Sequence, residues 1–108
     1  MSAVTQIDPA GLKAKMDVRQ PLCLLDVREP WEVALARIPG SLCIPMHEIP
    51  ARLGELDDAA EIIVMCHGGG RSQRAAEFLA GRGFGRVSNL RGGIDAWARD
   101  VDPDMPTY

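Results

Sequence analysis

Short apolar segments alternate with segments of helical spacing along this chain. The apolar segments lie at positions 3–7, 22–25, 42–44, 62–65 and 86–90. Runs of this length are typical of strands buried on both faces of a sheet. Between them, apolar residues recur three or four positions apart, as in Ile49, Leu53 and Leu56, which predicts helices with one buried face. The alternation predicts an α/β fold with a central five-stranded, mainly parallel sheet and helices on both faces.

Proline and polar residues mark the starts of the predicted helices. Pro9 and Pro30 stand at first helical positions, and Ser72 is a candidate N-cap for the helix that follows it. Trp31 and Trp97 fall on the apolar faces of their helices, so both are predicted to be core residues. The last segment, 103–108, holds two prolines and little else, which predicts a loosely held tail.

Composition narrows the class of protein without indicating its chemistry. The 108 residues suffice for one domain, 1–108, and a 46% share of hydrophobic residues excludes a disordered chain. A net charge of −3 provides no basic field for nucleic acid and no attraction to a membrane surface. The sequence shows neither a signal-like segment nor a long apolar stretch. Three cysteines without a C-x-x-C pair fit a reducing compartment, so a cytoplasmic location without disulfides or a metal site is expected.

The strand predicted over 62–65 stops at a cysteine that is followed by a glycine-rich loop. After Cys66 the loop consists of His67, Gly68, Gly69, Gly70, Arg71 and Ser72. A strand, a glycine-rich turn and a helix form a typical anion site, because several backbone N–H groups converge at the positive end of the helix. Such a site, with Arg71 close by, favours the thiolate, so Cys66 is predicted to be a nucleophile. The alternative is an inert buried cysteine at the end of a core strand.

Other roles stay open for parts of this loop. His67, if protonated, could lower the pKa of the thiol or attract an anionic donor, or its side chain could point to water. Ser72 could donate a hydrogen bond to the sulfur or serve only as an N-cap. A phosphate-binding loop is a weaker alternative, because no lysine follows the glycines and no well-spaced dinucleotide fingerprint is present.

A second polar segment ends the strand predicted over 22–25. Asp26, Arg28 and Glu29 follow that strand as the cysteine follows the strand at 62–65. Ligands of parallel α/β sheets bind outside the carboxyl ends of the strands, so these side chains are expected near the loop, where one of them could pair with Arg71. The alternatives are helix capping for Glu29 and solvent exposure for Arg28.

Four motifs follow one another along essentially the whole chain. They are Asp26-Val27-Arg28-Glu29, Ile38-Pro39-Gly40-Ser41 with Ile44-Pro45, Cys66-x-x-Gly69-x-Arg71, and Leu90-x-Gly92-Gly93-x-x-Ala96-Trp97. In order and spacing they resemble the single-domain rhodaneses, the thiosulfate sulfurtransferase family, whose three-layer rhodanese-like fold is therefore expected. Arg37 and Cys43 depart from the histidine and asparagine that the family often has near its turn. Both departures lie outside the active loop.

The resemblance implies a two-step sulfur transfer through Cys66. The thiolate attacks the outer sulfur of thiosulfate or a related small anionic donor, sulfite leaves, and a persulfide remains on the cysteine. A thiophilic acceptor then takes the sulfur: cyanide, or a thiol such as that of a sulfur-accepting protein. The N–H groups from His67 to Ser72 are expected to surround the outer sulfur of the persulfide. No metal or organic cofactor is implied, and a monomer or weak dimer is expected.

Two other interpretations compete with sulfur transfer. Cys-based phosphatases of related fold have five residues between cysteine and arginine, whereas four, 67–70, separate Cys66 from Arg71 here. The loop also lacks an acidic residue that could protonate a leaving alcohol. A rhodanese-like binding module would tend to lack the cysteine. A redox sensor would need Cys23 or Cys43 as its resolving thiol, and both lie in apolar segments that favour buried structural cysteines.

Overall fold

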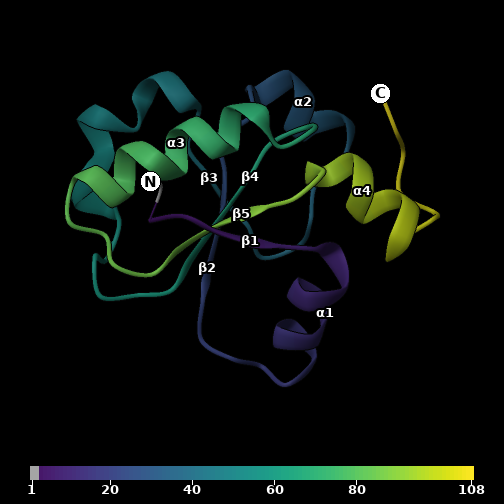
Figure 1. Ribbon diagram of the computed structural model, residues 1–108. Coiled ribbons are helices and arrows are strands. Elements are labelled where there is room, and N and C mark those ends of the chain that lie inside the picture. Colours follow the sequence, from purple (N-terminus) through teal and green to yellow (C-terminus); the bar gives the residue numbers. More distant parts are fainter. Residues whose placement is uncertain (1–2) are drawn as a thin grey trace.

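The computed structural model describes residues 3–108 and contains a five-stranded sheet (Figure 1). Its strands are β1 (Thr5–Ile7), β2 (Cys23–Asp26), β3 (Leu42–Cys43), β4 (Ile62–Met65) and β5 (Val87–Leu90). They lie in the order β1-β5-β4-β2-β3, and each neighbouring pair is parallel. The predicted α/β fold is confirmed, and the sheet is parallel throughout the described residues rather than mainly parallel.

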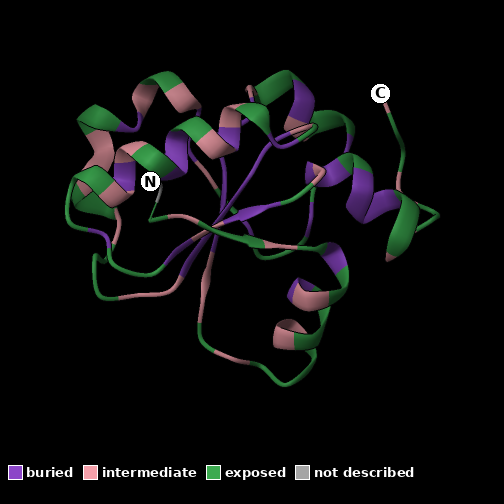
Figure 2. Cartoon of the chain, viewed as in Figure 1, coloured by how far each residue is buried: buried purple, intermediate pink, exposed green. Residues whose placement is uncertain are grey.

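Helices cover both faces of this sheet. The α-helices are α1 (Pro9–Asp17), α2 (Pro30–Leu35), α3 (Gly70–Gly81) and α4 (Gly93–Asp100). Residues of α3 pack on one face, and residues of α1 and α4 pack on the other (Figure 1). Figure 2 shows buried residues along the central strands, while the helices alternate between buried and exposed positions. Helical connections of this kind are what parallel strands require.

The central strand β4 contributes to two hydrophobic clusters at once. Ile62 and Val64 belong to the cluster that α3 covers, and Ile63 and Met65 belong to the cluster that α1 and α4 cover. All four side chains are 0% exposed. Successive strand residues point to opposite faces, so a strand buried on both sides needs an unbroken apolar run.

The segment predicted as a third α-helix, around 49–56, forms 3₁₀ helices instead. They are η1 (Met46–Glu48) and η2 (Pro50–Glu55). Their hydrogen bonds span three residues, as from the Arg52 N–H to the Ile49 carbonyl at 3.0 Å. Pro50 has no N–H to donate, and Arg52 has non-helical backbone angles, so an α-helical ladder does not form.

The two tryptophans differ in burial. Trp97 on α4 is 5% exposed and packs in the cluster beneath α1 and α4, as predicted. Trp31 is 62% exposed and Leu35 is 50% exposed, so the prediction of a core residue is wrong for Trp31. The reason is that α2 has six residues and buries the carboxylate-bearing Glu32 instead.

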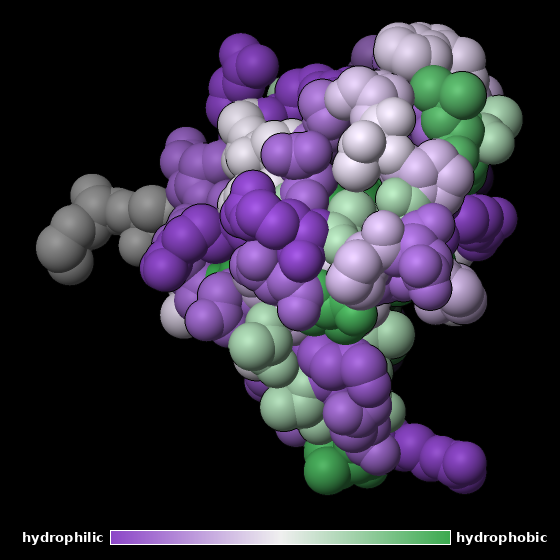
Figure 3. Space-filling view, turned by 90° about the vertical axis from the view of Figure 1, so that its right-hand side faces the viewer, coloured by the Kyte–Doolittle hydropathy of each residue, from purple (hydrophilic) through white to green (hydrophobic). Residues whose placement is uncertain are grey.

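The segment after α4 returns to the body of the protein. Met105 and Tyr108 pack against the cluster beneath α1 and α4. The expectation of a loosely held tail therefore does not describe these two residues. Polar residues cover much of the face in Figure 3, where hydrophobic residues are exposed in small separate areas. Within residues 3–108, no helix has the length and apolar character that crossing a membrane requires.

Candidate active site

The loop 66–72 leaves the carboxyl end of β4 and enters α3 directly. Gly69 is the N-cap of α3, with a φ of 107°. This left-handed conformation is strained for other residues and open to glycine. Ser72 lies inside the first turn of α3 and is 0% exposed, so the N-cap interpretation of Ser72 is wrong.

The Cys66 sulfur accepts hydrogen bonds from this loop. The Gly69 N–H group lies 3.0 Å from Sγ and the Ser72 hydroxyl 3.3 Å from it, and Cys66 is 1% exposed. Burial by itself would raise the pKa of the Cys66 thiol. Hydrogen bonds from the Ser72 hydroxyl and from the N–H groups of Ser72, Gly69 and Gly68 outweigh it and lower the pKa. The arrangement therefore favours a thiolate.

The first turn of α4 holds the carbonyl groups of the loop. The Ile94 N–H donates to the Cys66 carbonyl at 2.9 Å, and the Asp95 N–H donates to the His67 carbonyl at 3.1 Å. The N–H and C=O groups of a trans peptide point in opposite directions, so these bonds turn the N–H groups that follow each carbonyl away from α4. Gly93 permits the approach, because a Cβ there would lie 2.3 Å from the His67 oxygen.

Arg71 forms a two-point ion pair with Glu32 of α2. Its two terminal nitrogens lie 2.7 and 2.8 Å from the two carboxylate oxygens. The hydrogen bonds from Arg71 lower the pKa of Glu32 to about 2, although its burial opposes this. The positive charge beside the loop is therefore balanced by a carboxylate. Arg71 could have paired with the 26–29 segment, but its ion pair is with Glu32 of α2 instead.

The sequence position of Glu32 predicts a role in capping α2 but does not predict its ion pair with Arg71. Glu32 stands three residues after Glu29, and its carboxylate accepts a hydrogen bond from the Glu29 N–H at 2.9 Å. An acidic residue at this position of a helix typically closes a capping box. Its second partner, Arg71, is 39 positions away in sequence.

Replacing Glu32 with glutamine should destabilise the protein at neutral pH. The pKa of Glu32 is about 2 when folded and 4.5 ordinarily, so its contribution is complete above about pH 5 and is lost as the pH falls toward 2. The loss at neutral pH should reach at most about 3 kcal/mol. Denaturant midpoints for wild type and Glu32→Gln, measured between pH 2 and 7, should converge at the acid end.

The matched control for this pair is Glu55→Gln. Glu55 pairs with Arg52 on the surface, where solvent screens the interaction, so its midpoints should follow the wild type. A constant offset between wild type and Glu32→Gln at all pH values would contradict the role of the Glu32 charge.

Asp26 and Arg28 form a buried pair of their own. Both are 0% exposed, and the Arg28 guanidinium lies 2.8 Å from Asp26 Oδ2. It also donates to the backbone carbonyls of Ala36 at 2.7 Å and Glu32 at 3.2 Å. A buried arginine needs such partners, so Arg28 connects the end of β2 to α2, and the solvent-exposed alternative is wrong. Glu29 is the N-cap of α2, which confirms the capping alternative.

Tyr108, in the segment after α4, contacts Arg28, Glu32 and His67. Its hydroxyl accepts from Arg28 at 2.9 Å and donates to a Glu32 carboxylate oxygen at 2.9 Å. Its ring stacks on the His67 ring, with centroids 4.3 Å apart and an interplanar angle of 18°. The His67 side chain thus lies under Tyr108 instead of pointing freely to water, and its buried Nε2 makes no hydrogen bond within residues 3–108. No sequence pattern indicated a role for Tyr108 at this site.

The other two cysteines lie too far from Cys66 to pair with it. Cys23 is opposite Ile62 at the start of β4, four residues before Cys66, which corresponds to roughly 13 Å along the strand. Cys43 lies two strands away from β4, or roughly 10 Å. A disulfide needs Cα atoms within about 7 Å, so neither cysteine can resolve an oxidised Cys66 without backbone movement.

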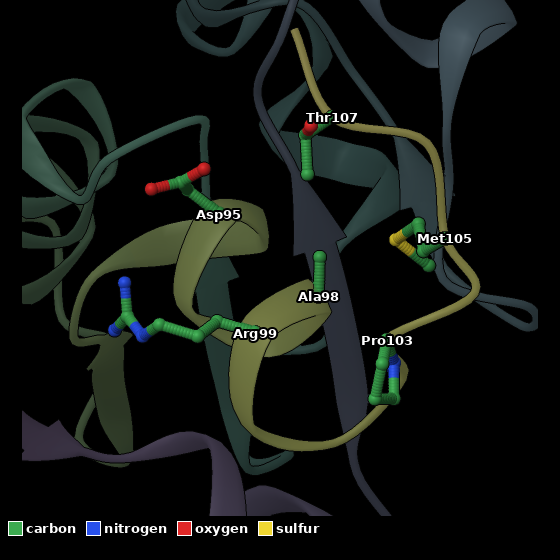
Figure 4. A pocket seen from close by; sticks show the side chains of 6 residues that line it. All are labelled: Asp95, Ala98, Arg99, Pro103, Met105 and Thr107. Carbon is green, nitrogen blue, oxygen red and sulfur yellow. The ribbon is translucent and has the colours of Figure 1, made fainter.

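A groove of about 400 Å³ lies between α4 and the tail (Figure 4). It is lined by Asp95, Ala98, Arg99, Pro103, Met105 and Thr107. None of these residues belongs to the 66–72 loop, so the groove is not the site of the cysteine. Across residues 3–108, no group of three histidine, cysteine, aspartate or glutamate side chains is placed to hold a metal.

Comparison with known proteins identifies related chains of similar length. The chain is 42% identical to a sulfurtransferase of Allochromatium vinosum, with 89% of this chain and 90% of the relative covered. It is 37% identical to the putative sulfurtransferase YtwF of Bacillus subtilis, over 93% of this chain and 96% of that protein. Several other relatives, among them the putative sulfur carrier protein YrkF of Bacillus subtilis, are longer, and the chain spans 21% to 52% of their length.

Solved structures of rhodanese-like proteins also resemble this chain. A rhodanese-like domain protein from Staphylococcus aureus matches with a TM-score of 0.84 and 30% identity, covering 97% of this chain and 99% of that chain. The family model described as the rhodanese-like domain matches residues 8–100, which include the loop, its ion pair and the first turn of α4. The chain belongs to the rhodanese-like domain family.

Proposed function

We propose that this protein is a sulfurtransferase that carries a sulfane sulfur on Cys66 as a persulfide. The observation that carries the proposal is the Cys66 sulfur at the focus of the loop, with the Gly69 N–H at 3.0 Å and the Ser72 hydroxyl at 3.3 Å. The sulfurtransferase of Allochromatium vinosum and the family match support sulfur transfer as the general activity.

In the first step, the Cys66 thiolate attacks the outer sulfur of a small anionic donor such as thiosulfate. A bond forms between Sγ and that sulfur, the bond to the sulfite sulfur breaks, and sulfite leaves with its electron pair. The negative charge of the persulfide lies on its outer sulfur. Loop N–H groups from His67 to Ser72 stabilise this charge, as fixed dipoles do in an anion site.

In the second step, a thiophilic acceptor attacks the outer sulfur. The bond between the two sulfurs of the persulfide breaks, Cys66 leaves as a thiolate, and the acceptor becomes thiocyanate or a new persulfide. Because the leaving thiolate is the resting nucleophile, a low pKa of Cys66 helps both steps. Both steps use the chain's own groups and need no metal or organic cofactor.

The ion pair of Arg71 with Glu32 argues against phosphatase activity. Both terminal nitrogens of Arg71 already bind the Glu32 carboxylate, so the guanidinium does not offer a free fork to a phosphate. The four-residue spacing from Cys66 to Arg71 also closes the loop more tightly than the five-residue spacing of related phosphatases. These features favour a ligand of one sulfur atom.

The partners we propose are a small anionic sulfur donor and either cyanide or a thiol acceptor. One relative is named a putative sulfur carrier protein, which supports a protein thiol as one acceptor class. Thiol acceptors and three unpaired cysteines fit a cytoplasmic location, and we propose a monomer or weak dimer.

The test is intact-protein mass spectrometry after brief incubation with thiosulfate and again after adding cyanide. The expected result is a mass gain of one sulfur atom, mapped to Cys66, that disappears as thiocyanate is released. A folded protein with a titratable thiol that gains no sulfur from thiosulfate or a related donor would contradict the proposal. A phosphate-ester substrate run in parallel would then show whether the loop serves a phosphatase.

A further inference from the structure

The Ser72 hydroxyl lies between two acceptors. Its oxygen is 3.3 Å from the Cys66 sulfur and 2.5 Å from the Asn89 side-chain oxygen. A serine hydroxyl has one proton, so it can donate to one of these atoms at a time. The thiol is free to donate its own proton to the Ser72 oxygen when the Ser72 proton points to Asn89.

A chain of side-chain amides fixes which atom Asn89 presents to Ser72. The Asn89 amide nitrogen donates to Gln6 at 3.0 Å, Gln6 donates to Gln73 at 2.6 Å, and Gln73 donates to the Glu77 carboxylate at 2.9 Å. An ionised carboxylate only accepts, so each amide in turn must donate toward Glu77. The Asn89 oxygen therefore faces Ser72.

The fold places Asn89 where this contact is possible. Asn89 is on β5, opposite Val64 of β4 and opposite Gln6 of β1, and it is 4% exposed. A buried amide oxygen that loses its hydrogen-bond donor is destabilised. The Asn89 oxygen therefore competes with the Cys66 sulfur for the Ser72 proton. No sequence motif indicated a role for Asn89.

We propose that Asn89 is a positioning residue, which takes the Ser72 proton while Cys66 is a thiol and yields it to the sulfur when Cys66 ionises. On ionisation the S–H bond breaks and its proton passes to water. The Ser72 hydroxyl turns about its Cβ–Oγ bond from Asn89 to Sγ, and no other covalent bond changes. The inference rests on the proposed function only for the role of Cys66 as nucleophile.

The consequence is a thiol that ionises less readily than Ser72 alone would allow. Ionisation breaks the Ser72–Asn89 hydrogen bond, so removing Asn89 removes this opposition. Asn89→Ala should lower the pKa of Cys66 by about one unit, and Ser72→Ala should raise it. Neither substitution changes the titratable or charged side chains of the loop, His67 and Arg71. Nor does either change the side chains joined to them, which are Glu32, Tyr108 and, through Tyr108, Arg28.

The experiment measures the pKa of Cys66 in the full chain from the pH dependence of its alkylation by iodoacetamide, read at that residue by mass spectrometry. It compares wild type, Asn89→Ala, Ser72→Ala and the double variant. The decisive expectation is that Asn89→Ala lowers the pKa in the wild-type background and has no effect in the Ser72→Ala background. A purely structural role for Asn89 would not depend on Ser72 in this way.

Ser88→Ala is the matched control, because Ser88 neighbours Asn89 on β5. In this variant the pKa of Cys66 should match the wild type. If Asn89→Ala does not fold, Gln6→Leu is the second variant. It removes the acceptor of the Asn89 amide nitrogen, so Asn89 is no longer held with its oxygen toward Ser72, and the pKa of Cys66 should fall by a smaller amount. An unchanged or raised pKa in the folded variant, or an equal shift in both backgrounds, would overturn the proposal. Alkylation needs no sulfur donor, so this outcome is distinct from a failure of sulfur transfer.

Discussion

Replacing Cys66 with serine is expected to abolish sulfur transfer while leaving the free energy of unfolding nearly unchanged. A serine hydroxyl is not ionised at neutral pH, and its oxygen cannot hold the transferred sulfur as a persulfide. The rate should fall by about 10³-fold or more, as when other enzymes lose their nucleophile. The smaller oxygen can still accept from Gly69 and Ser72, so the stability change should stay within about 1 kcal/mol.

The controls for this prediction are Cys23→Ser and Cys43→Ser. Neither residue lies at the loop, and burial raises the pKa of Cys23, so both variants should keep sulfur transfer. Thiocyanate release measures activity, and denaturant unfolding measures stability. Residual transfer by Cys66→Ser, or equal loss in all three variants, would show that the sulfur is carried elsewhere.

The parts of the fold that the sequence predicted are those set by local pattern. The apolar run at 62–65 predicts a strand with its observed bounds, because burial on both faces demands an apolar residue at each position. The segment around 49–56 has helical spacing but forms 3₁₀ helices, because Pro50 and its neighbours prevent α-helical hydrogen bonds. Spacing shows which residues lie on the same face of a helix, but not whether the rest of the protein covers that face. It therefore predicts burial for Trp31, which is exposed.

The site residues that the sequence missed act through partners far along the chain. Glu32 binds Arg71 across 39 positions, Tyr108 binds Arg28 across 80, and Asn89 binds Ser72 across 17. A local motif predicts the turn that holds Cys66, because the glycines of the turn and the start of α3 are adjacent in the sequence. It does not report which side chains from α2, β5 or the tail meet that turn once the sheet has formed.

Replacing Gly93 with alanine is expected to cause the largest loss of stability of any single methyl addition near the loop. The added Cβ would lie 2.3 Å from the His67 oxygen and 2.5 Å from the Cys66 oxygen, both backbone atoms. The φ of 61° also strains a residue with a side chain. Together the clash and the strain should lower the free energy of unfolding by about 3–5 kcal/mol.

The same substitution should reduce sulfur transfer in the molecules that remain folded. Relieving the clash moves the carbonyls of residues 66 and 67 away from α4, which lengthens their bonds to the Ile94 and Asp95 N–H groups and misdirects the loop N–H groups. The control is Gly81→Ala at the end of α3, where a Cβ meets nothing within 4 Å and stability should be unchanged or slightly higher.

Gly92→Ala separates the effect on the loop from the effect on stability. Gly92 also has a positive φ, 77°, but an added Cβ would meet the Ala96 side chain on α4 at 2.6 Å instead of the loop carbonyls. We therefore expect Gly92→Ala to lower stability with a smaller loss of transfer rate per folded molecule than Gly93→Ala. Denaturant unfolding and thiocyanate release, normalised to the folded fraction, measure the two effects. Wild-type stability and rate in Gly93→Ala would show that the contact between α4 and the loop does not shape the site.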